Sequence, residues 1–448
     1  MRFQTSDGDK LVIAGALRTP IGQAGKTLAD IESYELGCQV AEALFKKTGL
    51  DRSKIDGVVA GEINQSSRAP NVARVMAVKL GLPLESTAAT VANNCVSGYE
   101  ALVDASRRIL IGEGSVYLVS GLESMSRIPI YLKGARENSK TATVDKLKAN
   151  WAEALAAGVD AVDGVEEGLT DPIRNLNMAM TAEVAAQNYG LTKDTLDGYA
   201  HQSYKKAYDA IVAGKYRPYQ VSVKAGDELL EDDEFIMSKT GMVENPDRFK
   251  KASPLFDSKY MSLKQFYDMY GEWIRVKFEE GKSQATTTLF NACPRSDGAG
   301  AIILTTEKRA KELGLKPLAA LKSWGMYGVD PAYMGIGMAP AMKTAIDRAG
   351  MKWTDVKGFE IHEAFAATAM GTMRHVKENW GFDLEQANAD GKVNPHGGTL
   401  AMGHPLGATG LRVVINQLMH MEHKNVENCI GVICAGGGVG GSVLLEKV

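Results

Sequence analysis

The sequence lacks a long hydrophobic run and an excess of either charge. No uninterrupted apolar stretch reaches the roughly 18 residues that a membrane-spanning helix needs, so we expect no membrane span. The 51 Lys and Arg residues nearly balance the 54 Asp and Glu residues, and the formal net charge is −3. This balance provides no bulk attraction to nucleic acid or to an anionic membrane. We therefore expect no nucleic-acid partner.

Cysteine is also scarce, and its positions show no framework of paired spacings. We therefore expect a reducing cytoplasm, and the polar first ten residues show no signal-peptide pattern. No two cysteines have the close spacing typical of a zinc site, so we expect no metal. The five cysteines are Cys38, Cys95, Cys293, Cys429 and Cys434.

The hydrophobic pattern of the first 125 residues alternates between strands and helices. Buried-strand patterns lie at 12–16, 58–61 and 116–121, with helical patterns at 34–48 and 71–80. Such alternation predicts an α/β protein with parallel strands and covering helices. A length of 448 residues is typical of about three domains or lobes.

The last third of the chain repeats this order of elements. Residues 356–363 resemble 55–62, and 431–436 resemble 116–121. A glycine-rich turn at 397–410 precedes a helical pattern, as the Cys95 turn does. We therefore predict two similar halves packed as a pseudo-dimer. The predicted units are residues 1–126 plus about 251–306, an excursion at 127–250 that covers the site, and 307–448.

Cys95 lies between an extended apolar run and a helical pattern. The apolar spacing from Tyr99 to Leu110 predicts one buried helical face, which places Cys95 near a helix start. Free N–H groups and the helix dipole there favour a thiolate. A buried packing cysteine is the alternative.

Polar groups also gather at the C-terminal strand ends. Six of the seven histidines lie between 362 and 423. His362 ends an apparent strand, His404 lies in a glycine-rich turn, and Cys434 runs from a strand into Gly436–Gly438. Each residue alone fits a structural role, but three such turns together indicate a site.

These turns resemble motifs of the thiolase family, over most of the chain except roughly 131–170 and 220–284. The resemblance implies the thiolase fold, with two βαβαβαββ-type halves packed as a five-layer α-β-α-β-α pseudo-dimer with a long loop excursion. The matching segments are Arg18–Gly22, Asn94–Gly98, Gly121–Ser126, Asn394–Gly410 and Cys434–Gly438.

The resemblance implies CoA thioesters as substrates and no cofactor. Cys95 would attack the C3 ketone of a 3-ketoacyl-CoA, and His404 would take its proton and hold the thiolate as an ion pair. Cys434 would protonate the leaving acetyl-CoA enolate and then deprotonate CoA. One oxyanion hole would use the backbone N–H groups of Cys95 and Gly436. The other would use His404 and a water held by His362.

His362 departs from the asparagine that most thiolases carry at this position. The sequence His362-Glu363-Ala364-Phe365 is similar to thiolase subunits of fatty-acid β-oxidation trifunctional complexes. This favours degradative thiolysis over condensation of two acetyl-CoA by a short-chain acetoacetyl-CoA thiolase. The resemblance further implies a homodimer or homotetramer, with a hydratase/dehydrogenase α-type subunit as the partner in such a complex.

Three residues are expected to contact the substrate by resemblance: Met178, Cys293 and Phe365. Cys293 stands where serine usually contacts the pantetheine, and a thiol is a weaker donor. Arg295 is read as solvated or as a phosphate contact.

Two other functions remain open. A decarboxylating or synthase-type condensing enzyme would lack a catalytic second cysteine, so Cys434 argues against it. A non-catalytic acyl-CoA or lipid carrier would not need the set of Cys95, His404 and Cys434.

Overall fold

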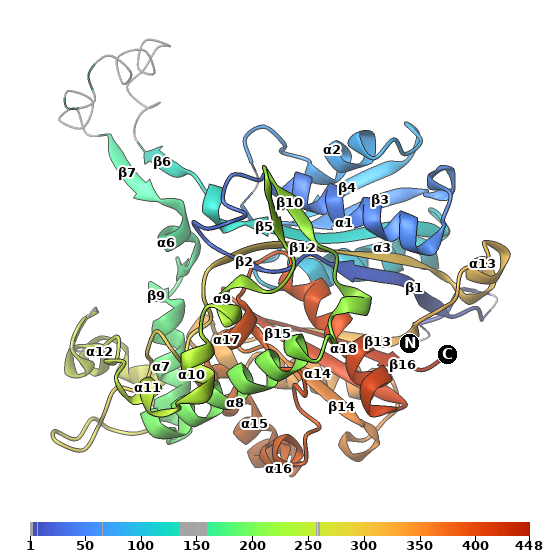
Figure 1. Cartoon of the computed structure of the whole chain (residues 1–448). Helices are drawn as coiled ribbons and strands as arrows, with labels where there is room; N and C mark the ends of the chain where they lie inside the picture. Colours follow the sequence, from blue (N-terminus) through green and yellow to red (C-terminus); the bar gives the residue numbers. More distant parts are fainter. Residues whose placement is uncertain are drawn as a thin grey trace.

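The structure is a computed structural model, and it describes residues 3–6, 8–64, 66–133, 150, 152, 159–256, 258 and 260–448. Part of the predicted excursion, at 134–149, 151 and 153–158, lies outside the described residues. Within the described residues, one ten-stranded mixed sheet runs through the molecule, with helices on its faces (Figure 1).

The first half of the chain builds one side of this sheet. Its strand order is β4-β3-β5-β12-β1. The strands predicted in the first 125 residues run in one direction, since β3 is parallel to β4 and β5. The patterns did not predict that β12 would lie antiparallel between β5 and β1. The elements are β1 (Leu11–Arg18), β2 (Gly22–Gln23), α1 (Ser33–Thr48), β3 (Gly57–Gly61), α2 (Val72–Lys79), β4 (Thr87–Val91), α3 (Ser97–Leu110), β5 (Val116–Ser124) and β12 (Ser296–Thr306).

The last part of the chain repeats this arrangement with strand order β14-β15-β16-β13. A single bridge between Phe359 and Val393 takes the place that β4 has in the first half. The turn at Gly437 and Gly438, both with positive φ, reverses the chain so that β16 is antiparallel to β15. The elements are α13 (Glu307–Glu312), β13 (Ala319–Gly328), α14 (Met338–Arg348), β14 (Gly358–Ile361), α15 (Ala366–Trp380), α16 (Leu384–Ala389), α17 (Thr399–Met402), α18 (Thr409–Lys424), β15 (Asn428–Ala435) and β16 (Val439–Glu446).

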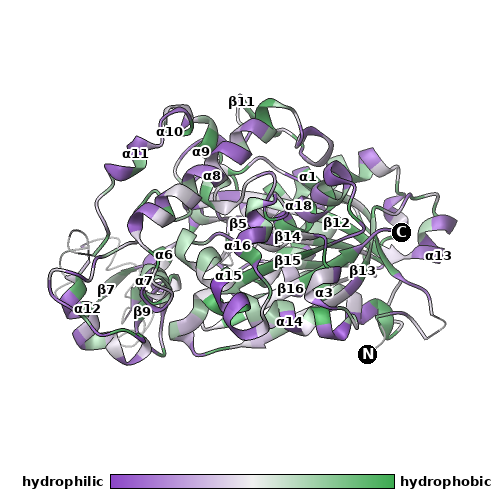
Figure 2. Cartoon of the chain, turned by 90° about the horizontal axis from the view of Figure 1, so that it is seen from below, coloured by the Kyte–Doolittle hydropathy of each residue, from purple (hydrophilic) through white to green (hydrophobic). Residues whose placement is uncertain are grey.

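The predicted five layers are confirmed. Helices α1 and α2 pack on the strands of the first half, and α14 packs on those of the second. Helices α3 and α18 lie in the middle layer and contact strands of both halves. Every residue of α18 from Thr409 to Met421 is buried, as expected of a helix that is enclosed on all sides. Hydrophobic colouring is concentrated on the central strands, whereas peripheral helices are mixed (Figure 2).

The two middle helices approach closely where they begin. A Cβ atom on Gly410 would lie 2.4 Å from the backbone nitrogen of Tyr99, and one on Gly98 would lie 2.8 Å from the carbonyl oxygen of Gly407. Only glycine fits at both positions, because backbone atoms occupy the space. This crossing brings the turns before α3 and α18 together.

The described part of the excursion is mainly helical. Helix α7 packs against α15, and α8 packs against α17 and α10. None of the described helices has both the length and the apolar character to span a membrane. The excursion elements are β6 (Ile130–Lys133), β7 (Asp160–Asp163), α6 (Gly164–Gly168), β8 (Thr170–Asp171), β9 (Leu176–Asn177), α7 (Met178–Asn188), α8 (Lys193–Val212), β10 (Val223–Ala225), β11 (Glu228–Leu230), α9 (Glu234–Met237), α10 (Thr240–Glu244) and α11 (Asp247–Lys250). Helix α12 (Leu263–Tyr270) follows in the segment 251–306, which was predicted to belong to the N-terminal half.

Candidate active site

Cys95 lies in the turn that joins β4 to α3. Asn94 has a φ of 45°, in the left-handed region that asparagine tolerates better than most residues. Its side-chain amide donates to the carbonyl oxygen of Gly436 at 2.8 Å, and the Ser97 hydroxyl donates to the carbonyl oxygen of Asn94 at 2.6 Å. These bonds hold the turn beside the Gly436 loop.

The thiol of Cys95 is protonated in the resting site. Burial raises the pKa of Cys95 to about 12, although the backbone N–H groups of Gly436 and of Cys95 itself oppose this rise. This direction is opposite to the expectation that the helix start favours a thiolate at Cys95. Desolvation in the assembled site outweighs the local N–H groups and dipole.

His404 is held so that its Nε2 is free to accept a proton. The Thr409 hydroxyl donates to the carbonyl oxygen of Pro405 at 2.9 Å, and its oxygen lies 2.7 Å from Nδ1 of His404. With the hydroxyl donating to Pro405, we assign Nδ1 as the donor to Thr409, which leaves the lone pair on Nε2. Nε2 is buried and has no partner among the described residues.

The resting histidine is neutral as well. Burial, followed by the charge of Arg412, lowers the pKa of His404 to about 3. The resemblance implies that His404 takes the proton of Cys95 during the reaction, and a neutral imidazole is the form that can accept it.

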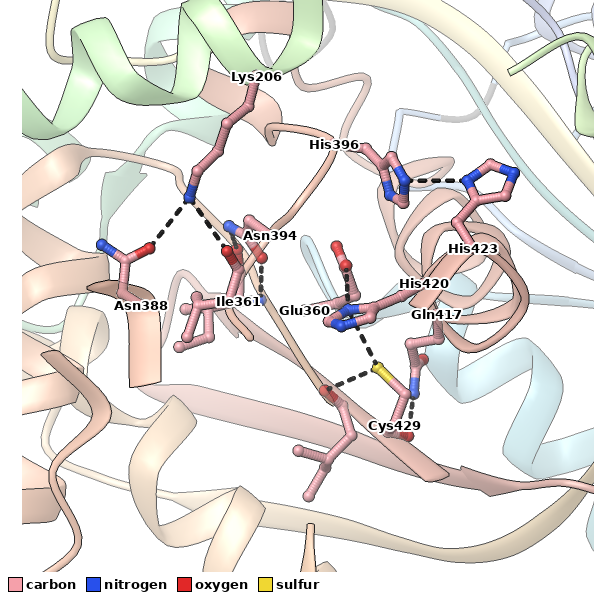
Figure 3. Close-up of polar contacts among 12 residues, drawn as sticks. Lys206, Glu360, Ile361, Asn388, Asn394, His396, Gln417, His420, His423 and Cys429 are labelled. Carbon is pink, nitrogen blue, oxygen red and sulfur yellow. Dashed lines mark hydrogen bonds and ion pairs between the residues drawn. The ribbon is translucent and has the colours of Figure 1, made fainter. Parts of the chain in front are cut away.

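His362 and Cys434 form a thiol–imidazole contact. Nδ1 of His362 lies 3.7 Å from Sγ of Cys434, and the rings of His362 and His404 are 4.4 Å apart. Burial lowers the pKa of His362 and raises that of Cys434, so both are neutral. Asn394 holds the strand before His362 through two 2.8 Å bonds to the backbone of Ile361 (Figure 3).

A short strap, residues 291–295, connects the turns that carry the two histidines. The N–H of Cys293 donates to the carbonyl oxygen of Ala364 at 3.0 Å, and the N–H of His404 donates to that of Pro294 at 3.1 Å. The strap also places Ala292 in a bridge with Phe365. Cys293 and Phe365 therefore lie beside the histidines.

Met178 lies at the site, whereas Arg295 lies at the surface. A Cβ atom on Gly436 would lie 3.4 Å from the sulfur of Met178, so this side chain borders the Gly436 loop. Arg295 pairs with Glu166 at the surface. The structure gathers all the other predicted site residues at one place: Cys95, Met178, Cys293, His362, Phe365, His404, Cys434 and Gly436.

Three further C-terminal histidines make contacts elsewhere. His396 lies 3.0 Å from His423, and His420 lies 3.0 Å from a carboxylate oxygen of Glu360 and 3.8 Å from Cys429 (Figure 3). Among the described residues, no group of three or more His, Cys, Asp or Glu side chains is arranged to hold a metal ion.

A basic cleft lies beside the strap, and it was not predicted from the sequence. The cleft has a volume of about 710 Å³ and is lined by Leu289 and Phe290, which directly precede the strap, and by Lys239, Arg248 and Lys251. Its charge suits the phosphates of a nucleotide thioester. The basic residues around 248–251 were a usable signal, but they fall in a segment without motif resemblance.

The fold and the site define a class of protein: an enzyme that transfers acyl groups. A thiol beside backbone N–H groups, an imidazole with an unpartnered Nε2 and a second thiol lie in this site, and groups of these kinds suit nucleophilic acyl transfer.

Comparisons with known proteins agree. Residues 11–261 match the family model "Thiolase, N-terminal domain", and residues 315–447 match "Thiolase, C-terminal domain". The chain is 33% identical to an acetyl-CoA acetyltransferase of Chromobacterium violaceum, over 98% of this chain and 100% of that one. It is 31% identical to a probable acetyl-CoA acyltransferase of Staphylococcus aureus, over 98% and 99%.

Solved structures show the same likeness. Human mitochondrial 3-ketoacyl-CoA thiolase in complex with CoA superposes with a TM-score of 0.82 at 27% identity, over 98% of both chains. Acetyl-CoA acetyltransferase from Syntrophomonas wolfei gives a TM-score of 0.83 at 29% identity, over 98% of this chain and 99% of that one. The chain belongs to the thiolase family and is an acyltransferase.

Proposed function

We propose that this enzyme cleaves 3-ketoacyl-CoA with CoA, producing acetyl-CoA and a shortened acyl-CoA in fatty-acid β-oxidation. The observation that carries the proposal is the free Nε2 of His404 in the same site as the Cys95 thiol and the Cys434–His362 contact. CoA and acyl-CoA are substrates, and the chemistry requires no cofactor.

The reaction begins from neutral groups. Nε2 of His404 takes the thiol proton of Cys95 as the thiolate adds to the C3 ketone, and the N–H groups of Cys95 and Gly436 stabilise the developing oxyanion. The C2–C3 bond then breaks, leaving an acyl group on Cys95 and an enolate of acetyl-CoA. The Cys434 thiol protonates the enolate carbon, and its thiolate next takes the proton of incoming CoA. The CoA sulfur attacks the acyl-enzyme, the bond between the acyl group and Cys95 breaks, and the Cys95 thiolate regains its proton from His404.

His362 supports the degradative direction, by resemblance to the trifunctional-complex subunits. We propose that the Cys434 contact with His362 is the feature adapted to this role. The likeness to acetyl-CoA acetyltransferases favours a second candidate, a short-chain acetoacetyl-CoA thiolase that condenses two acetyl-CoA.

The proposal also includes a binding site for CoA, an oligomeric state, a cellular compartment and a partner subunit. The basic cleft would hold the CoA phosphates, with Met178, Cys293 and Phe365 along the thioester. We propose a cytoplasmic homo-oligomer, which fits five unpaired cysteines and an open edge strand at β4. A hydratase/dehydrogenase α-type subunit is the partner to seek if long-chain substrates are preferred.

The test is CoA-dependent loss of 3-ketoacyl-CoA by the purified chain, with acetoacetyl-CoA compared against a long-chain substrate. We expect faster cleavage of the long chain and a covalent acyl adduct on Cys95, detected by mass spectrometry. Cys95→Ala should remove both the adduct and turnover, because the variant lacks the proposed nucleophile.

Each other outcome identifies an alternative. Preference for acetoacetyl-CoA would support the short-chain acetyltransferase. Binding of acyl-CoA with no cleavage and no adduct would support a carrier, and the proposed reaction would be wrong.

A further inference from the structure

Glu123 is a buried carboxylate behind the site that the proposed reaction does not use. It lies near the end of β5 with 0% of its surface exposed. It accepts backbone hydrogen bonds from Gly407 at 3.0 Å and from Ile63 and Asn64 at 3.2 Å each. Three N–H donors around one carboxylate favour its ionised form.

Gly407 belongs to the turn 403–410 that carries His404. A Cβ atom on Gly407 would lie 2.4 Å from the carbonyl oxygen of Leu122 and 2.8 Å from that of Gly61. No side chain fits there, because the backbone of the turn packs directly against the backbone at the strand ends. The hydrogen bond from the Gly407 N–H to the Glu123 carboxylate holds the turn in this position.

The other two donors connect Glu123 to the Cys95 side of the site. Ile63 and Asn64 follow β3, and the N–H of the preceding Glu62 donates to the carbonyl oxygen of Val91 at 3.2 Å. Val91 is the last residue of β4 before the Cys95 turn. One carboxylate therefore ties the His404 turn to the strand ends beside the Cys95 turn.

Glu62 lies next to Glu123 and differs in its surroundings. It is 1% exposed, accepts only from the Ser33 hydroxyl, and its second oxygen has no partner among the described residues. Burial, followed by the charge of Glu123, raises the pKa of Glu62 to about 8. Two adjacent buried carboxylates do not both ionise readily, so Glu62 is the one that keeps its proton.

We propose that Glu123 is a positioning residue for the base: through Gly407, its carboxylate sets the 403–410 turn so that Nε2 of His404 faces the Cys95 thiol. This inference rests on the proposed function for its kinetic consequences. Its structural consequence, protection of the Gly407 amide, is independent of any substrate.

The matched variants are Glu123→Gln and Glu62→Gln. Glutamine at 123 is neutral and keeps only one acceptor oxygen, so its NH₂ group must face at least one of the three N–H donors. The turn should therefore shift and kcat should fall about 10- to 100-fold, since small misplacements of catalytic groups have effects of that size. The KM for CoA should stay within about twofold, because the basic cleft is not altered. Glu62→Gln mimics the protonated acid and should retain most activity.

Two readouts distinguish positioning from general stability. Amide hydrogen exchange of the 403–410 segment should be faster in Glu123→Gln, while peptides from β12 and α14 exchange as in the wild type. Wild-type kcat should fall as pH drops below about 7, and this dependence should disappear in Glu123→Gln.

The direction of this pH dependence follows from the charged groups that face Glu123 and Glu62. Burial raises the pKa of Glu123 to about 7, and protonation below that pH removes an acceptor for the three N–H groups. The facing charges are Asp297 toward Glu123 and Glu32 toward Glu62, with Glu32 paired to Arg127 at 2.9 Å. The charge of Glu123 also raises the pKa of Cys95. His404, with a pKa of about 3, titrates far below this range.

Unchanged kcat and unchanged exchange in Glu123→Gln would overturn the proposal. If that variant does not fold, amide hydrogen exchange of the wild type at two pH values tests the proposal. Protection of the Gly407 amide should be weaker at pH 5.5 than at pH 8, and equal protection would overturn the proposal. If the wild type exchanges as expected but cleaves no ketoacyl-CoA, the proposed reaction fails and the positioning inference stands.

Discussion

At the scale of single residues, the site depends on neutral groups that become charged only during reaction. Burial raises the pKa of Cys95 and lowers that of His404, so neither is charged at rest. In the proposed reaction the neutral imidazole takes the thiol proton as the ketone is attacked, because the thiolate is the nucleophilic form. The direction of that transfer requires a lone pair on Nε2, which Thr409 secures.

Thr409→Val should therefore impair catalysis more than binding. The variant keeps the shape of threonine but leaves Nδ1 without its acceptor, so the tautomer with a free Nε2 loses about 1 kcal/mol of support. We expect kcat to fall about tenfold with little change in KM, as measured by steady-state thiolysis. Thr409→Ser retains the hydroxyl and should stay near wild-type activity. Equal losses in both variants would contradict the assigned tautomer.

At the scale of elements, the crossing of α3 and α18 determines where the site forms. The turns that carry Cys95 and His404 precede these two helices, and their distance is set by backbone contact at Gly98 and Gly410. The same contact explains why glycines follow both turns at the same place relative to the helix start. The packing of α3 against α18 therefore also sets the distance between the turns that carry Cys95 and His404.

Gly410→Ala should lower the melting temperature and the activity together. Its Cβ would lie 2.4 Å from the Tyr99 nitrogen, and a clash with backbone cannot be relieved by a rotamer change, so we expect a loss of at least about 1–3 kcal/mol. Gly198→Ala is the matched control. It lies inside α8 with no atom within 4 Å of the added Cβ, so it should stabilise by up to about 1 kcal/mol. Thermal unfolding of the two variants should shift in opposite directions, and an unchanged midpoint for Gly410→Ala would show that the helices can separate freely.

At the scale of the whole molecule, the two ends of the sheet differ. At one end β14 is fully buried, and at the other β4 has one exposed and four half-exposed residues. An open edge strand offers unpaired backbone groups to another chain. This asymmetry supports pairing of β4 with its copy in a homodimer.

Ala89→Lys should disrupt that dimer. A lysine at the centre of β4 would face its own copy across a twofold axis, and like charges directly opposite each other are unfavourable. We expect a dimer for the wild type and a monomer for the variant by size-exclusion chromatography with light scattering. Val212→Lys, at an exposed position 65% accessible on α8, is the control and should remain dimeric. A monomeric wild type would exclude the edge-strand interface.

Local pattern determined most elements and the residues of the candidate site. The predicted helices 34–48 and 71–80 correspond to α1 and α2 within a residue at each end, because apolar residues that recur with the 3.6-residue period mark the buried face of a helix. The repeated order of strands and helices also indicated the two halves, and motif resemblance identified Cys95, His362, His404 and Cys434. The residue limits of the predicted domains, and the roles assigned to these side chains, stay predictions.

Only the tertiary structure decided the protonation of the site and the contacts that hold it. Helix starts are visible in a sequence, but desolvation is not, and desolvation raises the pKa of Cys95 against the effect of the helix start. The acceptor role of Thr409, the anchoring of Gly407 by Glu123 and the cleft beside Phe290 likewise depend on residues that the fold brings together. Sequence patterns report which face of an element is buried, whereas pKa values and hydrogen-bond geometry depend on what other elements place against that face.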